Sequence, residues 1–352
     1  MGKLAIYKYF SFMILLITIM MSVFTFFGLF GGNANPAHET AMSLIVLLLP
    51  FFIAGNIITL IFWIIRLRWH WAAIPFLTLL CCIPYVGTFY QPSLFFSSNE
   101  RQGDFKIASY NVALFGREIT GFRADDILSE MRDQHVSILC LQEYMERSGD
   151  RDNTASYQSY FGYTAMGRND MVIFSQFPIK ASGIIDFGAT NNSGMWADID
   201  MKGKLIRIYN VHLETTGFNR TLHKAAKQKM ENDSPLQNSI ILNAIYGNFT
   251  RGMAVRAGQA DIIARHISDS KLPVIVCGDF NDVPYSYTYR TMKGDLIDGF
   301  TECGKGFMST LRGEKRVRID YIFHDESLHG IEYYKKELSY SDHDPVFMSI
   351  AF

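Results

Sequence analysis

Charged side chains are nearly absent from the first 99 residues of this 352-residue chain. That section contains four basic residues, Lys3, Lys8, Arg66 and Arg68, and one acid, Glu39. The other residues are mostly apolar or small. A section of this kind lacks the charged surface of a water-soluble domain and is typical of a membrane-embedded segment.

Three uncharged apolar runs lie in this section, at Tyr9–Phe30, Met42–Ile65 and Trp71–Tyr90. Each is close to the roughly 20 residues that a helix needs to cross the hydrocarbon core of a bilayer. A cleaved signal peptide followed by buried core helices is the alternative, but a second and a third run of this length argue against it. We therefore expect three transmembrane helices in a membrane domain at residues 1–92.

The basic residues predict the orientation of these helices. Both lysines precede the first run, both arginines lie between the second and third runs, and residues 31–41 contain neither Lys nor Arg. The positive-inside rule therefore places the N-terminus in the cytoplasm, and three crossings place everything after Tyr90 on the other side. We expect an integral protein of a bacterial inner membrane, with the remaining residues in the periplasm.

The part of the chain after the membrane section lacks a surplus of basic charge. From Glu100 onward it contains 29 of the 33 basic and 33 of the 34 acidic side chains, a net charge of about −4. Duplex DNA is bound largely through Lys and Arg contacts with phosphates, so this composition does not favour nucleic acid as a partner. It is compatible with a small or lipid-borne phosphate.

Cysteines are also few, and none has CxxC spacing. Cys81 and Cys82 lie in the apolar section, which leaves Cys140, Cys277 and Cys303, an odd number, for the soluble part. This excludes a zinc site of the CxxC kind and a disulfide framework. We interpret Cys140 and Cys277, which lie inside apolar runs, as buried core residues; a redox or ligand role is the alternative.

Short apolar runs with β-branched residues follow residue 104 and predict strands. These runs are Phe105–Val112, Val136–Leu141, Met171–Phe174, Met195–Met201, Leu205–Leu213, Pro273–Cys277, Ile319–Phe323 and Val346–Phe352. Helical periodicity appears at Ala124–Gln134 and Ala254–Ile267. Many strands with few intervening helices suggest two packed sheets with helices outside them, in a domain at residues 104–352.

Two further segments connect or extend these elements. Residues 93–103 are the expected linker, and the stretch from Tyr90 to the first strand reaches about 50 Å at most at roughly 3.3 Å per residue. The soluble domain therefore works near a membrane surface. Residues 218–251 mix lysines with apolar residues, and we interpret them as a lid or substrate-facing arm; a helix that packs on the periphery is the alternative.

Oxygen- and imidazole-bearing side chains gather at the ends of these apolar runs. The clusters are Asn111 in SYNV, Gln142 and Glu143 in CLQE, Asn210 and His212 in YNVHLE, Asp279 and Asn281 in VCGDFND, Asp320 in RIDYIF, and Asp342, His343 and Asp344 in SDHDP. Any one cluster alone is explained by turn chemistry, since Asx residues commonly make turns. Six together are better explained by one pocket at the edges of the sheets.

This set of side chains suits one class of chemistry. It contains carboxylates, amides and two histidines, without a Ser or Cys nucleophile beside a base. Oxygen-rich ligands favour a hard divalent cation, Mg²⁺ or alternatively Mn²⁺ or Ca²⁺, over zinc. Histidines paired with acids can stabilise or protonate a phosphoryl oxygen. The set therefore predicts metal-assisted attack of water on a phosphoester.

The motifs SYNV, LQE, NVHLE, GDFND, RIDYIF and SDHDPV, in that order, resemble those of the endonuclease/exonuclease/phosphatase superfamily. Its members include deoxyribonuclease I-like nucleases, abasic-site endonucleases, neutral sphingomyelinases and inositol polyphosphate 5-phosphatases. The resemblance covers about residues 104–352. It implies a four-layer α/β sandwich of two mixed sheets flanked by helices, here preceded by the three transmembrane helices, with the active site at one edge.

The resemblance also implies roles for the metal-binding side. Glu143 is the expected principal metal ligand, with Asn111 beside it, and Asp342 is expected to support the metal or the attacking water. An asparagine that contacts phosphate in relatives matches Asn169, with Asp170 as the alternative.

The same resemblance implies the catalytic roles. Asp279 is expected to orient or deprotonate the attacking water, and Asn281 to hold a phosphate oxygen. His343, polarised by Asp320, is expected to contact the phosphate. His212 matches a histidine that nuclease and sphingomyelinase members set against the scissile phosphate. Arg256 and Gln259 resemble a helical Arg-x-x-Gln feature that we interpret as structural.

Three functions are compatible with these expectations. The first is hydrolysis of a membrane-proximal phosphoester outside the cytoplasm, such as a lipid head group or a small phosphate ester, with the bilayer and that substrate as partners. The second is an extracytoplasmic nuclease, which His212 permits and the net charge weakens. The third is a non-catalytic membrane-bound binding module, which the complete set of catalytic-type residues argues against.

Overall fold

Three apolar helices form the first part of the molecule. The computed structural model describes residues 3–92, 103–116, 124–144, 153–168, 170–188, 190, 192–215, 238–313 and 316–352. Its first elements are α1 (Lys3–Gly31), α2 (Thr40–Ile65), α3 (Trp69–Cys81) and α4 (Ile83–Gly87). Tyr7–Gly31, Thr40–Ile65 and Trp69–Gly87 are long and apolar enough to cross a membrane. This agrees with the three expected spans, and residues 3–92 are called the membrane segment below.

Polar side chains in the membrane segment bond to one another between α1 and α2. Ser22 Oγ donates to Asn56 Oδ1 at 2.8 Å, and Asn56 Nδ2 donates to Thr25 Oγ1 at 2.9 Å. Trp63 Nε1 donates to Thr18 Oγ1 at 2.9 Å. A bilayer core offers no water to these groups, so bonds between helices hold the two helices in register.

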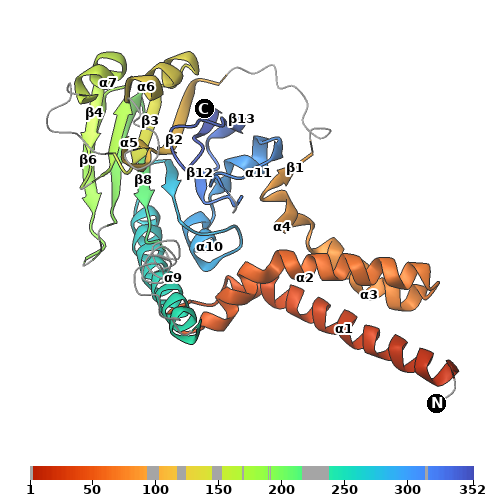
Figure 1. The fold of residues 1–352 in the computed structure, drawn as a ribbon. Helices are drawn as coiled ribbons and strands as arrows, with labels where there is room; N and C mark the ends of the chain where they lie inside the picture. Colours follow the sequence, from red (N-terminus) through yellow and green to blue (C-terminus); the bar gives the residue numbers. More distant parts are fainter. Residues whose placement is uncertain are drawn as a thin grey trace.

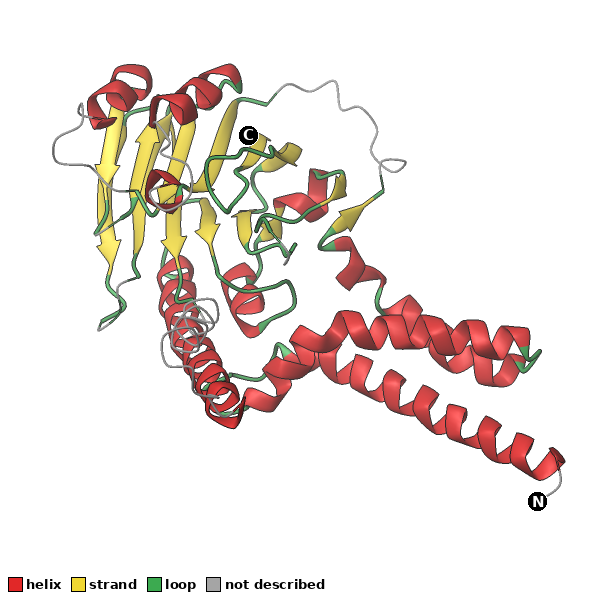
Figure 2. Cartoon of the chain, in the orientation of Figure 1, coloured by secondary structure: helices red, strands yellow, loops and turns green. Residues whose placement is uncertain are grey.

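Two six-stranded sheets form the rest of the molecule (Figures 1 and 2). The first sheet, in spatial order, contains β10 (Ile297–Asp298), β12 (Asp320–His324), β9 (Val274–Asp279), β8 (Lys204–His212), β7 (Gly194–Met201) and β6 (Ile179–Ile185). The second contains β13 (His329–Lys335), β14 (Val346–Ala351), β2 (Phe105–Asn111), β3 (Ile138–Gln142), β5 (Val172–Ser175) and β4 (Tyr163–Met166). Both sheets are mixed, since β2–β3 and β8–β9 are parallel pairs and the other pairs are antiparallel.

The two sheets pack face to face and carry helices on their outer faces. Ile107 and Cys140 of the second sheet share a buried apolar core with Ile208 and Cys277 of the first. Apolar residues of α6 (Ala124–Asp133) and α7 (Asn153–Phe161) cover the outside of the second sheet. Those of α9 (Asn238–Ser268) and α10 (Tyr287–Lys293) cover the first. The expected four-layer sandwich is therefore confirmed, and both cysteines lie in its core.

The structure adds elements that the sequence patterns did not predict. β4, β6 and β13 are edge or next-to-edge strands, and most residues of β6 are exposed, so they lack the apolar runs of central strands. The expected helix at residues 254–267 belongs to the 31-residue helix α9, which begins at Asn238. α9 thus takes up the end of the 218–251 segment, whose residues 218–237 lie outside the described part of the chain.

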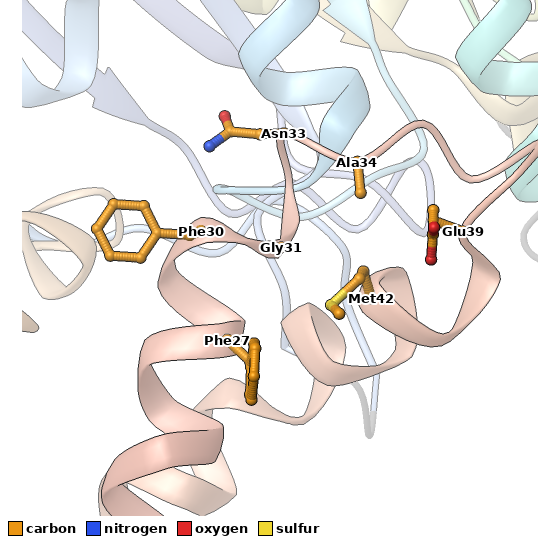
Figure 3. A pocket seen from close by; sticks show the side chains of 7 residues that line it. All are labelled: Phe27, Phe30, Gly31, Asn33, Ala34, Glu39 and Met42. Atoms are coloured by element: carbon orange, nitrogen blue, oxygen red, sulfur yellow. The ribbon is translucent and has the colours of Figure 1, made fainter.

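A cavity of about 420 Å³ lies where α1 and α2 meet. Phe27, Phe30, Gly31, Asn33, Ala34, Glu39 and Met42 line it (Figure 3). None of these residues belongs to the polar clusters that follow the strands. The cavity is therefore separate from the site described below.

Candidate active site

Strand register brings three of the expected residues together at one edge of the first sheet. The parallel β8–β9 pair places His212 opposite Asp279, and the antiparallel β9–β12 pair places Asp320 opposite Asp279. In the second sheet the parallel β2–β3 pair ends with Asn111 opposite Gln142, and Glu143 follows directly. Polar residues at strand ends therefore meet where the two sheets face each other.

The Asp279 carboxylate is the centre of this group. Its Oδ2 accepts a hydrogen bond from Asn111 Nδ2 at 3.0 Å and lies 3.7 Å from His343 Nε2 and 4.0 Å from His212 Nε2. Asn111 Nδ2 also lies 3.3 Å from Glu143 Oε1. Residues from β2, β3, β8, β9 and the 341–344 segment thus surround one buried carboxylate oxygen.

Two histidines approach Asp279 in the same manner, each with an aspartate behind it. His343 Nδ1 lies 2.9 Å from Asp320 Oδ2, and His212 Nδ1 lies 3.4 Å from Asp170 Oδ2. His212 Nε2 lies 3.8 Å from Glu143 Oε1. In each pair the aspartate orients the ring and turns Nε2 toward the centre of the site.

These contacts change the pKa of all three central groups. Burial lowers the pKa of His343, but the carboxylates of Asp320 and Asp279 outweigh it and raise the pKa to about 10. Burial also lowers the pKa of His212, and its bond to Asp170 together with two further carboxylates raises it above the ordinary value. Burial raises the pKa of Asp279, and the two histidines only partly oppose this. Both shifts favour the protonated form of the rings, and Asp279 is a stronger base than an exposed aspartate.

The backbone around the site is strained at two of its residues. Glu143 has φ 51° and Asn281 has φ 52°, in the left-handed region. Asn tolerates this region, whereas for Glu it costs about 1–2 kcal/mol. Strain of this kind persists where the surrounding structure fixes a functional side chain.

A tight turn follows β9. Gly278 has φ 136°, and a Cβ there would lie 1.9 Å from the Val211 carbonyl oxygen, so only glycine fits. Asn281 N donates to Asp279 Oδ1 at 2.8 Å, and Asn281 Nδ2 donates to the Leu213 carbonyl at 2.9 Å. Phe280 packs in the outer apolar core, away from the site.

Some polar residues in the strand-end clusters do not contact the Asp279 carboxylate. Gln142 Nε2 donates to Asn210 Oδ1 at 2.6 Å, and Asn210 Nδ2 donates to the Leu141 carbonyl at 2.9 Å, so this pair ties the two sheets together. Asp342 is exposed and accepts a 3.4 Å bond from Ser341 Oγ. Its charge is one of those, after Asp320 and Asp279, that raise the pKa of His343, so it lies beside the group. Asn169 lies outside the described residues.

Asp170 is the main site residue that the sequence left undecided. The only signal for it was its place before the apolar run that forms β5, where it was an alternative to Asn169 as a phosphate contact. The structure gives it a different role, as the acid behind His212.

Arg256 and Gln259 hold the loops behind the site, as expected. Arg256 donates to the Glu214 carbonyl at 2.8 Å and to Asp282 Oδ2 at 3.1 Å, while Gln259 Oε1 accepts from Glu214 N at 2.7 Å. They fix the chain after β8 and after β9 without contacting the central group.

The site also fits a divalent cation. One donor atom from each of Asp279, Asp320 and His343 lies within 4.8 Å of the others, and all three residues are buried. Asp320 Oδ1 is buried without a hydrogen-bond partner among the described residues, as expected of an atom that a cation would complete. Glu143, whose side chain is 34% exposed, adds a further carboxylate beside this group. Asn111 turns its amide nitrogen toward Glu143 and Asp279, while its Oδ1 accepts from Ala113 N at 3.0 Å. Carboxylate and amide oxygens suit a hard cation.

Comparison with protein families decides the identity of this arrangement. Residues 108–343 match the model of the endonuclease/exonuclease/phosphatase family. The chain belongs to this family. Members of the family are metal-dependent phosphoester hydrolases, which agrees with the buried acid–histidine group. Residues 11–89 match a second model that is described only as a domain of unknown function.

Solved structures of the family show the same fold. A family protein from Beutenbergia cavernae DSM 12333 is similar over 72% of this chain and 72% of its own, with 17% sequence identity and a TM-score of 0.51. One from Bacteroides vulgatus is similar over 70% of this chain and 98% of its own, with 15% identity and a TM-score of 0.51. No curated protein matches the chain.

Proposed function

We propose that this family member is a Mg²⁺-dependent hydrolase that cleaves a phosphoester near the membrane, outside the cytoplasm, by direct attack of water. Its substrate is a lipid head group or a small phosphate ester. The observation that carries the chemistry is the group around Asp279 Oδ2, where one amide and two imidazoles converge on a buried carboxylate. The membrane segment and the net charge of about −4 after residue 99 support the choice of substrate.

Each side chain has a role in this mechanism. Asp279, whose pKa burial raises, orients a water and accepts its proton. His343, kept protonated by Asp320, donates a hydrogen bond to a phosphoryl oxygen, and His212 does so from the opposite side. Asn281 holds a further phosphate oxygen.

The cation has a defined place in this scheme. Glu143 and Asn111 are its proposed principal ligands, with Asp320 Oδ1 as a further free donor. When bound, the cation supplies positive charge against the phosphate and lowers the pKa of a coordinated water.

A substrate panel tests this function with the full chain. The purified protein in detergent and Mg²⁺ is offered a phospholipid diester in liposomes, a small phosphomonoester and plasmid DNA. We expect turnover of the lipid or the small ester, its loss in Asp279→Asn and Glu143→Gln, and its retention in Asp269→Asn, a change at an exposed aspartate. Cleavage of DNA alone would refute the proposed substrate class, and turnover that survives both active-site changes would refute the proposed mechanism.

A nuclease is the second candidate. The observation that favours it is the second histidine, since the His212–Asp170 pair sets a further imidazole beside Asp279. Plasmid cleavage that requires His212 would select this candidate.

The proposed location has its own test. A reporter enzyme that folds only outside the cytoplasm, fused after Phe352, is expected to be active. Activity of a cytoplasm-dependent reporter at the same position would reverse the proposed orientation.

A further inference from the structure

The membrane segment contacts the catalytic domain at two places along the chain, the end of α1 and the stretch that follows α4. After α4, β1 (Tyr90–Gln91) pairs antiparallel with β11 (Gly306–Phe307), and Met308 N donates to the Phe89 carbonyl at 2.7 Å. At the end of α1, Arg290 Nη2 donates to the Leu29 carbonyl at 2.6 Å. Figure 1 shows β1 beside α11.

The contact near α1 has the close fit of a built interface. A Cβ at Gly32 would lie 1.9 Å from the Tyr285 carbonyl oxygen, so only glycine allows this approach. The Tyr285 ring packs edge-on against Tyr85 of α4, with ring centroids 5.2 Å apart. Asn35 Nδ2 reaches the Tyr287 hydroxyl at 3.3 Å.

Arg318, a buried residue of the catalytic domain, also bonds to the membrane segment. Its side chain is 0% exposed, donates two bonds to Asp298 at 2.8 and 2.6 Å, and donates a third at 2.7 Å to the carbonyl of Thr88, at the C-terminal end of α4. Its Nε is buried without a hydrogen-bond partner among the described residues, so this charge depends on the acceptors of the other two nitrogens. The membrane segment therefore supplies one acceptor of a fully buried charge.

Arg318 lies two residues before Asp320 in the segment that starts β12. The amides of Ile319 and Asp320 both donate to Thr310 Oγ1, at 3.0 and 3.1 Å. Leu311, the residue after Thr310, forms a bridge with His343, whose ring Asp320 holds at 2.9 Å. A short, fully bonded path thus leads from Thr88 to the Asp320–His343 pair.

We propose that the membrane segment positions the catalytic Asp320–His343 pair through Arg318, so that the docked membrane helices are part of the support of the active site. The inference rests on the proposed hydrolytic function for its kinetic test. Arg318 is a positioning residue, since it touches neither substrate nor cation. A displacement of about 1 Å at such a pair can cost about a hundredfold in rate.

A matched pair of variants tests the positioning role in the full-length protein. Arg318→Lys keeps the charge but loses the fork that joins Asp298 and Thr88, whereas Arg290→Lys removes the other guanidinium that bonds a membrane-segment carbonyl. We expect Arg318→Lys to lower kcat at least about tenfold with KM within about twofold. Arg290→Lys is expected to leave kcat unchanged. Equal kcat values in wild type and Arg318→Lys would overturn the proposal, as would an equal loss in both variants.

A variant in the membrane segment tests the same role independently, in case Arg318→Lys misfolds. One glycine inserted between Gly87 and Thr88 shifts the Thr88 carbonyl away from Arg318 and leaves every residue of the catalytic domain in place. The same fall in kcat is expected. Unchanged kcat in a folded insertion variant would contradict the role of Thr88.

Docking of the membrane segment on the catalytic domain can also be measured directly, by whether the two pieces stay together after the chain is cut between them. A protease site is introduced between residues 93 and 102, and the cleaved protein is passed over a gel-filtration column in detergent. We expect the two pieces to elute together, and to separate more readily when Arg318 is changed to Lys. Complete separation of the wild-type pieces with undiminished kcat would refute the proposal, while wild-type pieces that stay together but hydrolyse nothing would refute only the hydrolytic function.

Discussion

The membrane segment and the catalytic domain both bury polar side chains, but they satisfy them differently. In the membrane segment Asn56 bonds Ser22 and Thr25, and Trp63 bonds Thr18. Among the described residues, every buried side-chain polar atom without a partner lies after residue 104. Asp170 Oδ1 and Asp320 Oδ1 of the site are among them, together with atoms outside it such as Arg318 Nε.

This difference bears on stability and on activity. An unpaired buried polar atom costs about 1–3 kcal/mol, and none is left among the described residues of the membrane segment. At the site, the proposed cation would complete Asp320 Oδ1. The comparison therefore predicts that changes in the membrane segment cost stability, whereas changes at the site cost rate.

Removal of the cation should have the largest effect and is the strongest test of this comparison. In excess chelator we expect hydrolysis to fall to background and to return on addition of Mg²⁺, because the oxygen donors around Asp320 suit a hard cation. The thermal transition of the protein is measured in the same samples. Full activity in verified metal-free protein would contradict the proposed cation site.

Two residues on one face of β8 allow the effects on rate and on stability to be compared within a single strand. His212→Gln removes an imidazole from the site and is expected to lower kcat about 10²–10⁴-fold, with little change in thermal stability. Asn210→Ala breaks the tie between the sheets and is expected to cost about 1–3 kcal/mol, with kcat per folded molecule unchanged. The reverse assignment, rate loss from Asn210→Ala and stability loss from His212→Gln, would show that the site lies deeper between the sheets.

The pH dependence of stability reports on the His343–Asp320 pair. The folded-state pKa of His343 is raised to about 10 from 6.5, so its contribution to stability is complete below pH 6.5 and is lost as pH rises toward 10. In metal-free protein we expect the midpoint of thermal unfolding to fall over this range, and to fall less steeply in His343→Gln. Parallel curves for the two proteins would show that the pair does not stabilise the fold.

The smallest expected effect lies in the membrane segment. Asn56→Ala removes the bonds to Ser22 and Thr25 and is expected to destabilise the helix pair by about 1 kcal/mol. Turnover in detergent should not change, because Asn56 contacts no part of the domain that binds phosphate. Thr40→Ala, at the start of α2, is the matched control, since its hydroxyl bonds only within its own turn. A fall in kcat with Asn56→Ala would mean that helix register also reaches the site.

Much of the fold was predictable because it follows short-range patterns. Central strands such as β9 and β12 have apolar runs with an acid at one end, Asp279 as the last residue of β9 and Asp320 as the first of β12. The helices of the membrane segment have uncharged runs of the length of a bilayer. β6 was not predictable, because its residues are mostly exposed and carry no apolar run. The pairing of Tyr90–Gln91 with Gly306–Phe307 joins distant parts of the chain, and no local pattern reports it.

The site was predictable as a set but not in every role. The strand-end positions of Asp279, Asp320 and His343 and their motifs identified the central group. Asn210 and His212 differ by two positions and share a face, so periodicity could not tell which is a tie between sheets and which faces the phosphate. The position of each residue along β8, between the sheets or at their edge, determines its role. That position depends on how the two sheets pack against each other.

The position of β14 has a consequence for biosynthesis. This strand lies between β13 and β2, pairs Val346 with Ser109, and follows directly on the segment that carries His343. β2 therefore keeps an open edge until the residues of β14 have been synthesised. The segment that carries His343 precedes β14 directly, so the group around Asp279 assembles only at that late stage of translation.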